Sequence, residues 1–176
     1  MNSSSSGPVA LTSPAGRAVL IAATLGSGMT LLDGTVVNVA LKTIGQDMHA
    51  DLAALQWITN GYLLTLASFI LLGGSLGDRL GRRRVFTWGV IAFAAASIMC
   101  GLAWSPLVLV IARFAQGLGA ALLTPGSLSM IQGALIPADR ARAIGAWSGL
   151  GGIATAAGPF IGGLLIELAS WRWIFL

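Results

Sequence analysis

Residues 74–86 read GSLGDRLGRRRVF, and they separate two long apolar runs of the chain. This stretch holds four of the ten Lys and Arg residues, beside a single acid. The core of a soluble protein does not place such a cluster between segments with almost no other charge, whereas a loop at a membrane surface does. The stretch therefore predicts a membrane protein with a basic turn between two spans.

Composition supports the same class. Hydrophobic residues make up 56% of the 176 residues and charged residues only 9%, whereas soluble domains carry about 25% charge. The net charge of +4 lies in short turns and not on a polar face, so we expect membrane lipids and not nucleic acid as partners. The single cysteine, Cys100, lies in an apolar run and has no partner for an intrachain disulfide.

Five apolar runs are long enough to cross about 30 Å of hydrocarbon as helices. Lipid offers no hydrogen-bonding partner to the backbone, and the alternating segments of a β-barrel are missing from the sequence. We expect an all-α membrane protein with five complete transmembrane helices and the start of a sixth at Trp171. The five predicted spans are 18–41, 55–76, 85–104, 107–135 and 143–168.

Charge on the loops predicts the orientation, because Lys and Arg collect on the cytoplasmic side. With the N-terminus in the cytoplasm, that side holds Arg17, Arg79, Arg82, Arg83, Arg84, Arg140 and Arg142. The other side holds Lys42 and Arg172. Residues 1–16, rich in Ser, Pro and Gly, are expected to be a disordered cytoplasmic tail, and residues 17–176 a partial transmembrane half-bundle.

Two ionisable residues lie inside the predicted spans. Asp33 lies eight residues before the outer end of the first span, or roughly 12 Å deep at helical rise. Arg113 lies six residues after the outer end of the fourth, or about 9 Å deep. Because isolated charges at such depths are costly, we expect the two to face each other or a water-filled cavity. The alternative for Arg113 is that it extends outward to the headgroups.

A carboxyl that moves between an apolar and a cation-rich environment can bind and release protons. We therefore single out Asp33 and Arg113 as candidates for proton coupling.

The spacing G-x-L-G-D-R-x-G-R-R-x-x-F of residues 74–86 resembles the loop between helices 2 and 3 of the major facilitator superfamily. The resemblance implies that this loop is a latch between the two halves of a transporter. The residues that would form the latch are Asp78, Arg79, Gly81, Arg82 and Arg83. Orientation by positive charge alone would account for the arginines but not for Asp78 or Gly81.

Further motifs resemble those of the fourteen-helix drug:proton antiporters of this superfamily. Residues 32–41, LDGTVVNVAL, resemble their first-helix motif, although Lys42 stands where the family has proline. Residues 109–121, LVIARFAQGLGAA, resemble the fourth-helix motif, whose arginine is linked to proton coupling. Residue for residue, that role falls on Arg113.

The fifth span contains Gly158-Pro159-Phe160-Ile161-Gly162-Gly163, which resembles the motif typical of antiporters rather than symporters. The motif residues are Gly158, Pro159, Gly162 and Gly163. The family has a further glycine where this chain has Ala154, a small residue as well. A proline bend with a packing role alone is the other interpretation.

Polar residues near the spans are candidates for lining a substrate cavity, and interhelical hydrogen bonding is the alternative. They are Asn38, Gln56, Trp57 and Gln116. The sequence shows no metal-ligand cluster, no nucleophile–base pair and no phosphate loop. We therefore expect no enzyme activity and no cofactor apart from the proton as coupling ion.

The resemblance implies proton-coupled efflux of lipophilic or cationic drugs across the cell membrane. The chain ends six residues into the sixth span, so we expect a truncated N-terminal part of a major facilitator bundle that needs the missing C-terminal half for transport. The alternatives are a non-transporting membrane module, or a transporter of this superfamily for another small solute.

Overall fold

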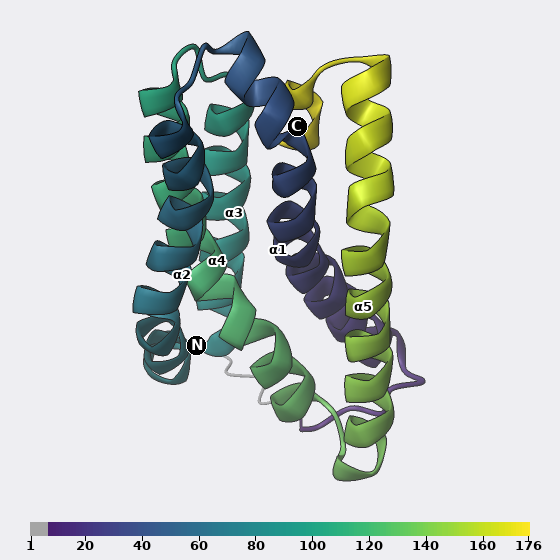
Figure 1. Ribbon diagram of the computed structural model, residues 1–176. Helices are drawn as coiled ribbons and strands as arrows, with labels where there is room; N and C mark the ends of the chain where they lie inside the picture. The colour runs from purple at the N-terminus through teal and green to yellow at the C-terminus, as the bar shows by residue number, and fades with distance from the viewer. Residues whose placement is uncertain (1–6) are drawn as a thin grey trace.

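The computed structural model describes residues 7–176 as five long α-helices and a short 3-10 helix (Figure 1). Successive helices run in opposite directions. One end of the bundle therefore holds the start of the first helix, the turn between the second and third helices, and the turn between the fourth and fifth. Arg79 to Arg84 and Arg140 lie at or next to these turns, and we call this end the arginine end. In chain order the elements are α1 (Pro14–Asp47), α2 (Leu52–Leu80), α3 (Arg82–Gly101), α4 (Pro106–Ala134), α5 (Pro137–Leu168) and η1 (Trp171–Ile174).

The prediction of five spans is confirmed, since all five helices are long and apolar enough to cross a membrane. All five helices begin before the predicted apolar runs, and polar side chains cap the starts of α1, α2 and α4. α3 and α4 end earlier than predicted, at Gly101 and Ala134 and not at residues 104 and 135. Ser13 accepts a hydrogen bond from the N–H of Gly16 at the start of α1, and Asp51 does the same for Ala54 in α2. Such caps satisfy backbone donors that the first turn leaves free.

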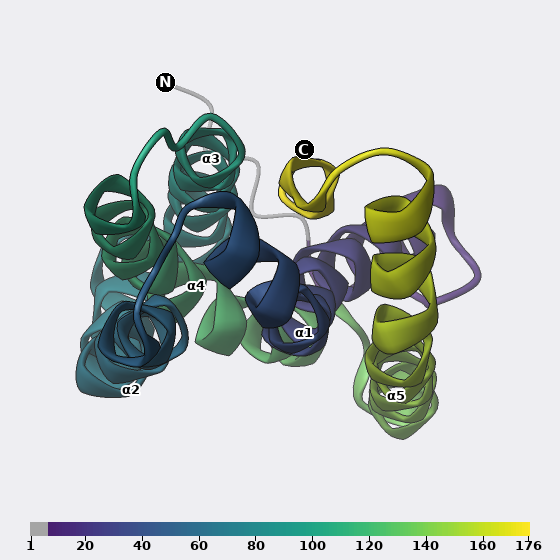
Figure 2. The ribbon, with the colours of Figure 1, turned by 45° about the horizontal axis from the view of Figure 1, so that its top comes forward.

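The predicted start of a sixth span is the 3-10 helix η1, which is fastened to the end of α1 (Figure 2). The buried Trp171 donates its indole N–H to Asp47 Oδ2 over 2.9 Å. Arg172 Nη1 donates to the same oxygen, also over 2.9 Å. These two bonds hold η1 at the end of the bundle opposite the arginine end.

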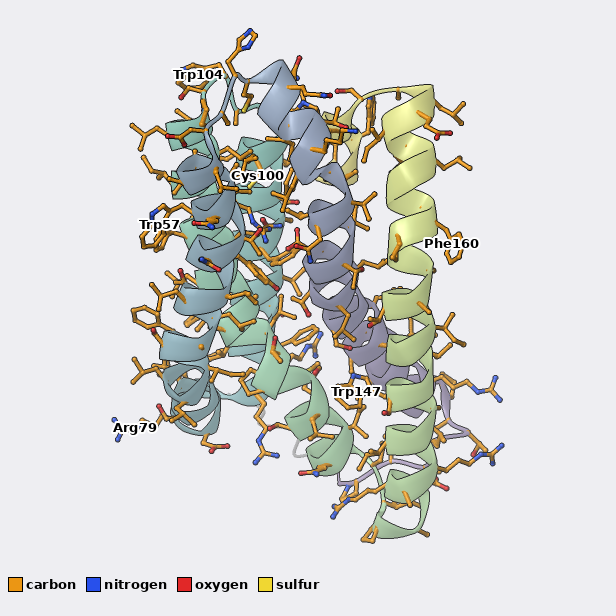
Figure 3. The ribbon with its side chains drawn as sticks, viewed as in Figure 1. Trp57, Arg79, Cys100, Trp104, Trp147 and Phe160 are labelled. Atoms are coloured by element: carbon orange, nitrogen blue, oxygen red, sulfur yellow. The ribbon has the colours of Figure 1, made fainter. Side chains whose placement is uncertain are left out.

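The helices pack as two neighbouring groups, one of α2, α3 and α4 and the other of α1 and α5. α4 packs against α2 and α3, while α1 lies between α4 and α5. The lipid-facing surface is apolar: Leu71 is 84% exposed and Phe160 is 81% exposed, and Phe160 points away from the bundle (Figure 3). Exposed apolar side chains on every helix are what a bilayer, and not water, accommodates.

The structure differs from the predicted tail over residues 7–16, whereas residues 1–6 of that tail lie outside the described residues. Val9 donates its N–H to the carbonyl of Ala134 over 2.8 Å. The N–H of Leu11 donates to Asp139 Oδ2 over 2.8 Å, and α1 already begins at Pro14. Residues 7–13, which we call the N-terminal arm, are thus held by hydrogen bonds to residues beside the turn between α4 and α5. Amino-acid composition alone could not reveal these distant partners.

Close contact between α2 and α4 depends on Gly73. A Cβ at this position would collide with the backbone carbonyl of Ala121. We expect Gly73→Ala to lower the free energy of unfolding by about 1–3 kcal/mol, as overpacking does elsewhere. The measurement is the unfolding midpoint in detergent micelles.

The adjacent glycine is the matched control, because a Cβ at Gly74 would meet only the side chain of Pro125 at 3.8 Å. Gly74→Ala is expected to be neutral or to stabilise the protein, by up to about 1 kcal/mol of helix propensity. Equal destabilisation by both substitutions would contradict the close α2–α4 contact.

Candidate functional site

The candidate site is a buried ion pair between α1 and α4. Arg113 Nη1 donates to Asp33 Oδ2 over 2.7 Å. The side chain of Arg113 is 1% exposed and that of Asp33 is 7% exposed. The structure therefore brings together the two ionisable residues that the sequence placed at similar depth in separate spans.

α2 holds the guanidinium of Arg113 from the other side. Arg113 Nε donates to the backbone carbonyl of Ile58 over 3.0 Å. Its Cζ lies 4.3 Å from the centre of the Tyr62 ring, a cation–π distance. Arg113 thus points into the helix bundle and not outward to the headgroups, which was the alternative expectation.

Gln116 binds both members of the ion pair. Its Oε1 accepts from Arg113 Nη1 over 2.6 Å, and its Nε2 donates to Asp33 Oδ1 over 2.9 Å. The sequence indicated a cavity-lining residue, but Gln116 is completely buried and belongs to this network instead. Its position three residues after Arg113, on the same face of α4, is the signal that could have revealed this.

α3 extends the network with two residues that the sequence did not single out as functional. Gln116 Nε2 also donates to Ser97 Oγ over 3.3 Å, and Ser97 Oγ donates to the carbonyl of Phe175 over 2.8 Å. Cys100 Sγ lies 3.5 Å from Gln116 Oε1 as a weak donor. Small polar side chains within an apolar run give no pattern that sequence inspection can detect.

The site consists of a carboxylate and a guanidinium that are paired in the interior of the bundle. In the apolar interior a lone charge is costly, whereas a hydrogen-bonded pair offsets much of that cost. If Asp33 is neutral, Arg113 still has Gln116 Oε1 and the carbonyl of Ile58 as acceptors. Within residues 7–176 no group of His, Cys, Asp and Glu could hold a metal ion.

A cavity of about 390 Å³ reaches Asp33 from between α1, α3 and α5. The other predicted cavity residues lie elsewhere and do not line it. Asn38 and Gln56 are exposed. Trp57 is half exposed on the outer side of α2, where its ring stacks on Phe114 with centroids 6.1 Å apart (Figure 3). A substrate-binding role for these three residues stays a prediction.

The turn between α2 and α3 is short and exposed. Gly81 joins the two helices with φ +98°, a conformation that favours glycine. Arg82, the first residue of α3, contacts Asp78 Oδ1 over 3.2 Å and donates to the carbonyl of Ser129 in α4 over 3.0 Å. Arg79 points away from the bundle at the arginine end (Figure 3).

Arg83, the remaining predicted latch residue, lies beside a second cavity. This cavity, of about 560 Å³, lies between α1, α3 and α4 and also contacts Phe86 and Met130. Of the five predicted latch residues, the structure thus joins only Asp78 and Arg82 by a side-chain contact.

The α5 motif faces the part of α1 that follows Asp33. A Cβ at Gly158 would collide with Thr35 Oγ1, and one at Gly162 would lie 3.0 Å from a methyl of Val36. Pro159 lies within a continuous α5, and a Cβ at Gly163 would meet nothing within 4 Å. The structure therefore brings Gly158 and Gly162, but not Gly163, into close contact with α1.

Comparison with known proteins places these features in a family. The sequence model described as Major Facilitator Superfamily matches residues 23–176. The Tetracenomycin C resistance and export protein of Streptomyces glaucescens is 46% identical over 156 residues, covering 89% of this chain and 29% of that protein. The Methylenomycin A resistance protein of Bacillus subtilis is 42% identical over 166 residues, covering 94% of this chain and 36% of that protein.

A solved structure agrees with the helix arrangement. The inward-facing, unoccupied structure of a bacterial homologue of the human lysosomal transporter Spinster superposes with a TM-score of 0.77 at 25% identity. The match covers 93% of this chain and 37% of that one. The chain spans about a third of the length of the relatives it matches.

Proposed function

Because this chain belongs to the major facilitator superfamily, we propose that it is part of a transporter that exports lipophilic drugs in exchange for protons. Its relatives are named for antibiotic resistance and drug export, which supports drugs as the substrate class. The observation that carries the proton coupling is the buried, hydrogen-bonded pair of Asp33 and Arg113.

In this proposal Asp33 takes up a proton when the site opens to the outside and gives it up when the site opens to the cytoplasm. Arg113 stabilises the ionised carboxylate, and its contacts with Ile58 and Gln116 hold it in place during either state. Two half-bundles rocking around a midplane site would expose it to each side in turn. The drug moves outward as the proton moves inward.

The remaining motifs receive their roles by the same inference. Asp78, Arg79, Gly81, Arg82 and Arg83 form the latch toward a second half-bundle, which the transporter needs for a complete cycle. Gly158, Pro159, Gly162 and Gly163 let α5 move against α1, and the close contacts of Gly158 with Thr35 and of Gly162 with Val36 support this role. Asn38, Gln56 and Trp57 contact the drug.

The proposed location is supported by the distribution of charge and by the relatives. The chain is a multi-pass membrane protein, and we place it in the cell membrane with its N-terminus in the cytoplasm. The basic turns at the arginine end then lie on the cytoplasmic side, as the distribution of Lys and Arg in membrane proteins predicts. Anionic lipid headgroups are the expected partners of these arginines.

Transport in inside-out membrane vesicles tests the function, with ethidium as a lipophilic cationic probe. The vesicles carry the transporter that contains this chain, and an imposed pH gradient makes their interior acidic. We expect ethidium to accumulate and to leave again when nigericin collapses the pH gradient. Vesicles without the transporter are the control.

Two results would contradict the proposal in different ways. Ethidium accumulation that survives the loss of the pH gradient would exclude proton coupling. Failure to move ethidium or any antibiotic tested, together with transport of an amino acid or a sugar, would exclude drugs as the substrate class.

A further inference from the structure

We propose that the ring of Tyr62 stabilises the guanidinium of Arg113 while Asp33 carries its proton, and that the ring thereby sets the pH at which proton and drug exchange. The inference rests on the proposed function in taking Asp33 as the group that is protonated during transport. Tyr62 is a positioning residue in this view, because it acts through Arg113 and binds neither the proton nor the drug.

α2 presents a carbonyl and an aromatic ring, one helical turn apart, to the same guanidinium. The carbonyl of Ile58 accepts from Arg113 Nε over 3.0 Å. The ring of Tyr62, four residues later, has its centre 4.3 Å from Arg113 Cζ. Tyr62 is 2% exposed and Arg113 is 1% exposed, so the contact is shielded from water. Cation–π contacts are strongest when both partners are desolvated in this way.

Glycines in both helices bring the ring to this position. A Cβ at Gly117 would collide with the backbone carbonyl of Tyr62, and a Cβ at Gly61 would lie 2.9 Å from the ring of Phe114. Gly117 follows Arg113 by one turn of α4, so the two lie on the same side of that helix. The backbone of α2 therefore approaches α4 directly beside Arg113, and helix packing holds the ring against the guanidinium.

The charge state of Asp33 determines how much the ring contributes. When Asp33 is ionised, its Oδ2 accepts from Arg113 over 2.7 Å. The negative face of the ring then attracts the cation but repels the carboxylate, and the two effects partly cancel. When Asp33 is neutral, the guanidinium is a buried charge without a counter-ion. The ring then adds its full attraction to the hydrogen bonds that Arg113 donates to Ile58 and Gln116.

The ring therefore favours the protonated state of the site, and weakening it has a predictable sign. The protonated state loses more stability than the ionised state, so a more acidic solution is needed to place a proton on Asp33. In the proposed exchange the drug binds after Asp33 has lost its proton. Weakening the ring should therefore extend drug binding to lower pH, whereas damage to the packing would weaken binding at every pH.

Ionisable side chains reach this site from four helices. They are Asp33 on α1, Tyr62 on α2, Cys100 on α3 and Arg113 on α4. Over residues 7–176, α5 and η1 contribute no ionisable side chain to the hydrogen bonds of the site. A second ring, that of Phe175, lies farther from Arg113, with 5.9 Å between its centre and Cζ. The test therefore changes the charge distribution of the Tyr62 ring and leaves every other ionisable group in place.

The test replaces Tyr62 by phenylalanine and by fluorinated phenylalanines, introduced by stop-codon suppression into the transporter that contains this chain. Fluorine withdraws electrons from the face of the ring and weakens its attraction for a cation, with little change in size. Tyr62→Phe is the reference, because it keeps the ring and loses only the hydroxyl, whose bond to the carbonyl of Thr30 is 3.5 Å long. The binding constant of ethidium, a permanent cation, is measured in nanodiscs over a series of pH values.

We expect Tyr62→Phe to bind ethidium with the pH midpoint of the original protein. Tyr62→trifluorophenylalanine should move the midpoint by about 0.5–1 pH unit toward acid. This shift corresponds to about 0.7–1.4 kcal/mol, within the range of a buried cation–π contact. Below the original midpoint this variant should bind ethidium about three to ten times more tightly, with the same affinity at alkaline pH. Tyr62→difluorophenylalanine should give an intermediate shift.

The matched control places trifluorophenylalanine at Phe69, which is 41% exposed on the same helix, and should leave the midpoint unchanged. An unchanged midpoint in Tyr62→trifluorophenylalanine, or a shift toward alkaline pH, would overturn the inference. Weaker binding at alkaline pH with an unmoved midpoint would also overturn it, because the ring would then act on the drug or on the packing.

The same titrations separate this inference from the proposed function. Asp33→Asn should bind ethidium without the pH midpoint. If this midpoint persists in Asp33→Asn, or if the original protein has none, the proposed proton exchange at Asp33 is wrong and the role of Tyr62 is wrong with it. A midpoint that depends on Asp33 but does not respond to fluorine would refute the role of the ring alone and leave the proton exchange intact.

Discussion

Asp33→Asn is expected to reduce pH-driven drug export to the level of vesicles without the transporter. The amide keeps the size of the carboxyl and can still accept from Arg113, so the helices should pack as before. It cannot take up or release a proton, however, and in our account that exchange at Asp33 is what links export to the pH gradient. The loss should therefore appear in transport and not in the amount of protein inserted in the membrane.

The measurement compares ethidium accumulation in inside-out vesicles that contain equal amounts of protein. Asp51→Asn is the matched control, because Asp51 caps α2 with an exposed side chain and asparagine caps a helix equally well. This variant should export like the original protein. Export by Asp33→Asn that still responds to nigericin would show that another group carries the proton.

Arg113→Met is expected to destabilise the protein by about 3–5 kcal/mol, the usual effect of removing one partner of a buried ion pair. The substitution leaves Asp33 buried without its cation. It also removes the donors to Gln116 Oε1 and to the carbonyl of Ile58. These groups lie in the interior, where water does not replace the lost partner at low cost.

The comparison variant is Arg172→Met, because Arg172 also forms an ion pair, with Asp47 over 2.9 Å, but both side chains are more than a third exposed. Pairs of this kind contribute about 0–1 kcal/mol. Unfolding midpoints in detergent should separate the two variants clearly. Adding Asp33→Asn to Arg113→Met should recover part of the loss, since the orphaned charge is removed. Equal effects of the two arginine substitutions would contradict the buried network.

Hydropathy was sufficient to predict the helices of this chain. The five apolar runs each had the length that a membrane span requires, and each predicted span overlaps one observed helix. The third and fourth spans were predicted to end at residues 104 and 135, whereas α3 ends at Gly101 and α4 at Ala134. The helix ends were harder to predict, because α1 continues to Asp47 through a mostly polar stretch in which Ile44 is the single large apolar residue. The arm at residues 7–13 was missed because its partners lie more than a hundred residues away, at Ala134 and Asp139.

Of the residues in the candidate site, only the charged ones could be predicted from the sequence. The depth of Asp33 and of Arg113 could be counted from the span ends, and the cost of unpaired charge in lipid implied that they meet. The positions of Gln116, Ser97 and Tyr62 depend on how four helices are rotated about their axes. The hydrophobic pattern does not fix that rotation, because these helices are apolar on nearly all sides.

Proton release on drug binding tests the central claim most directly. The purified transporter is mixed with drug in weakly buffered detergent solution that contains a pH indicator, in the pH range where drug affinity changes with pH. If Asp33 exchanges its proton for the drug, binding releases protons from the original protein and none from Asp33→Asn, while Asp51→Asn behaves like the original. Equal proton release from Asp33→Asn, or drug binding without any release by the original protein, would contradict the account.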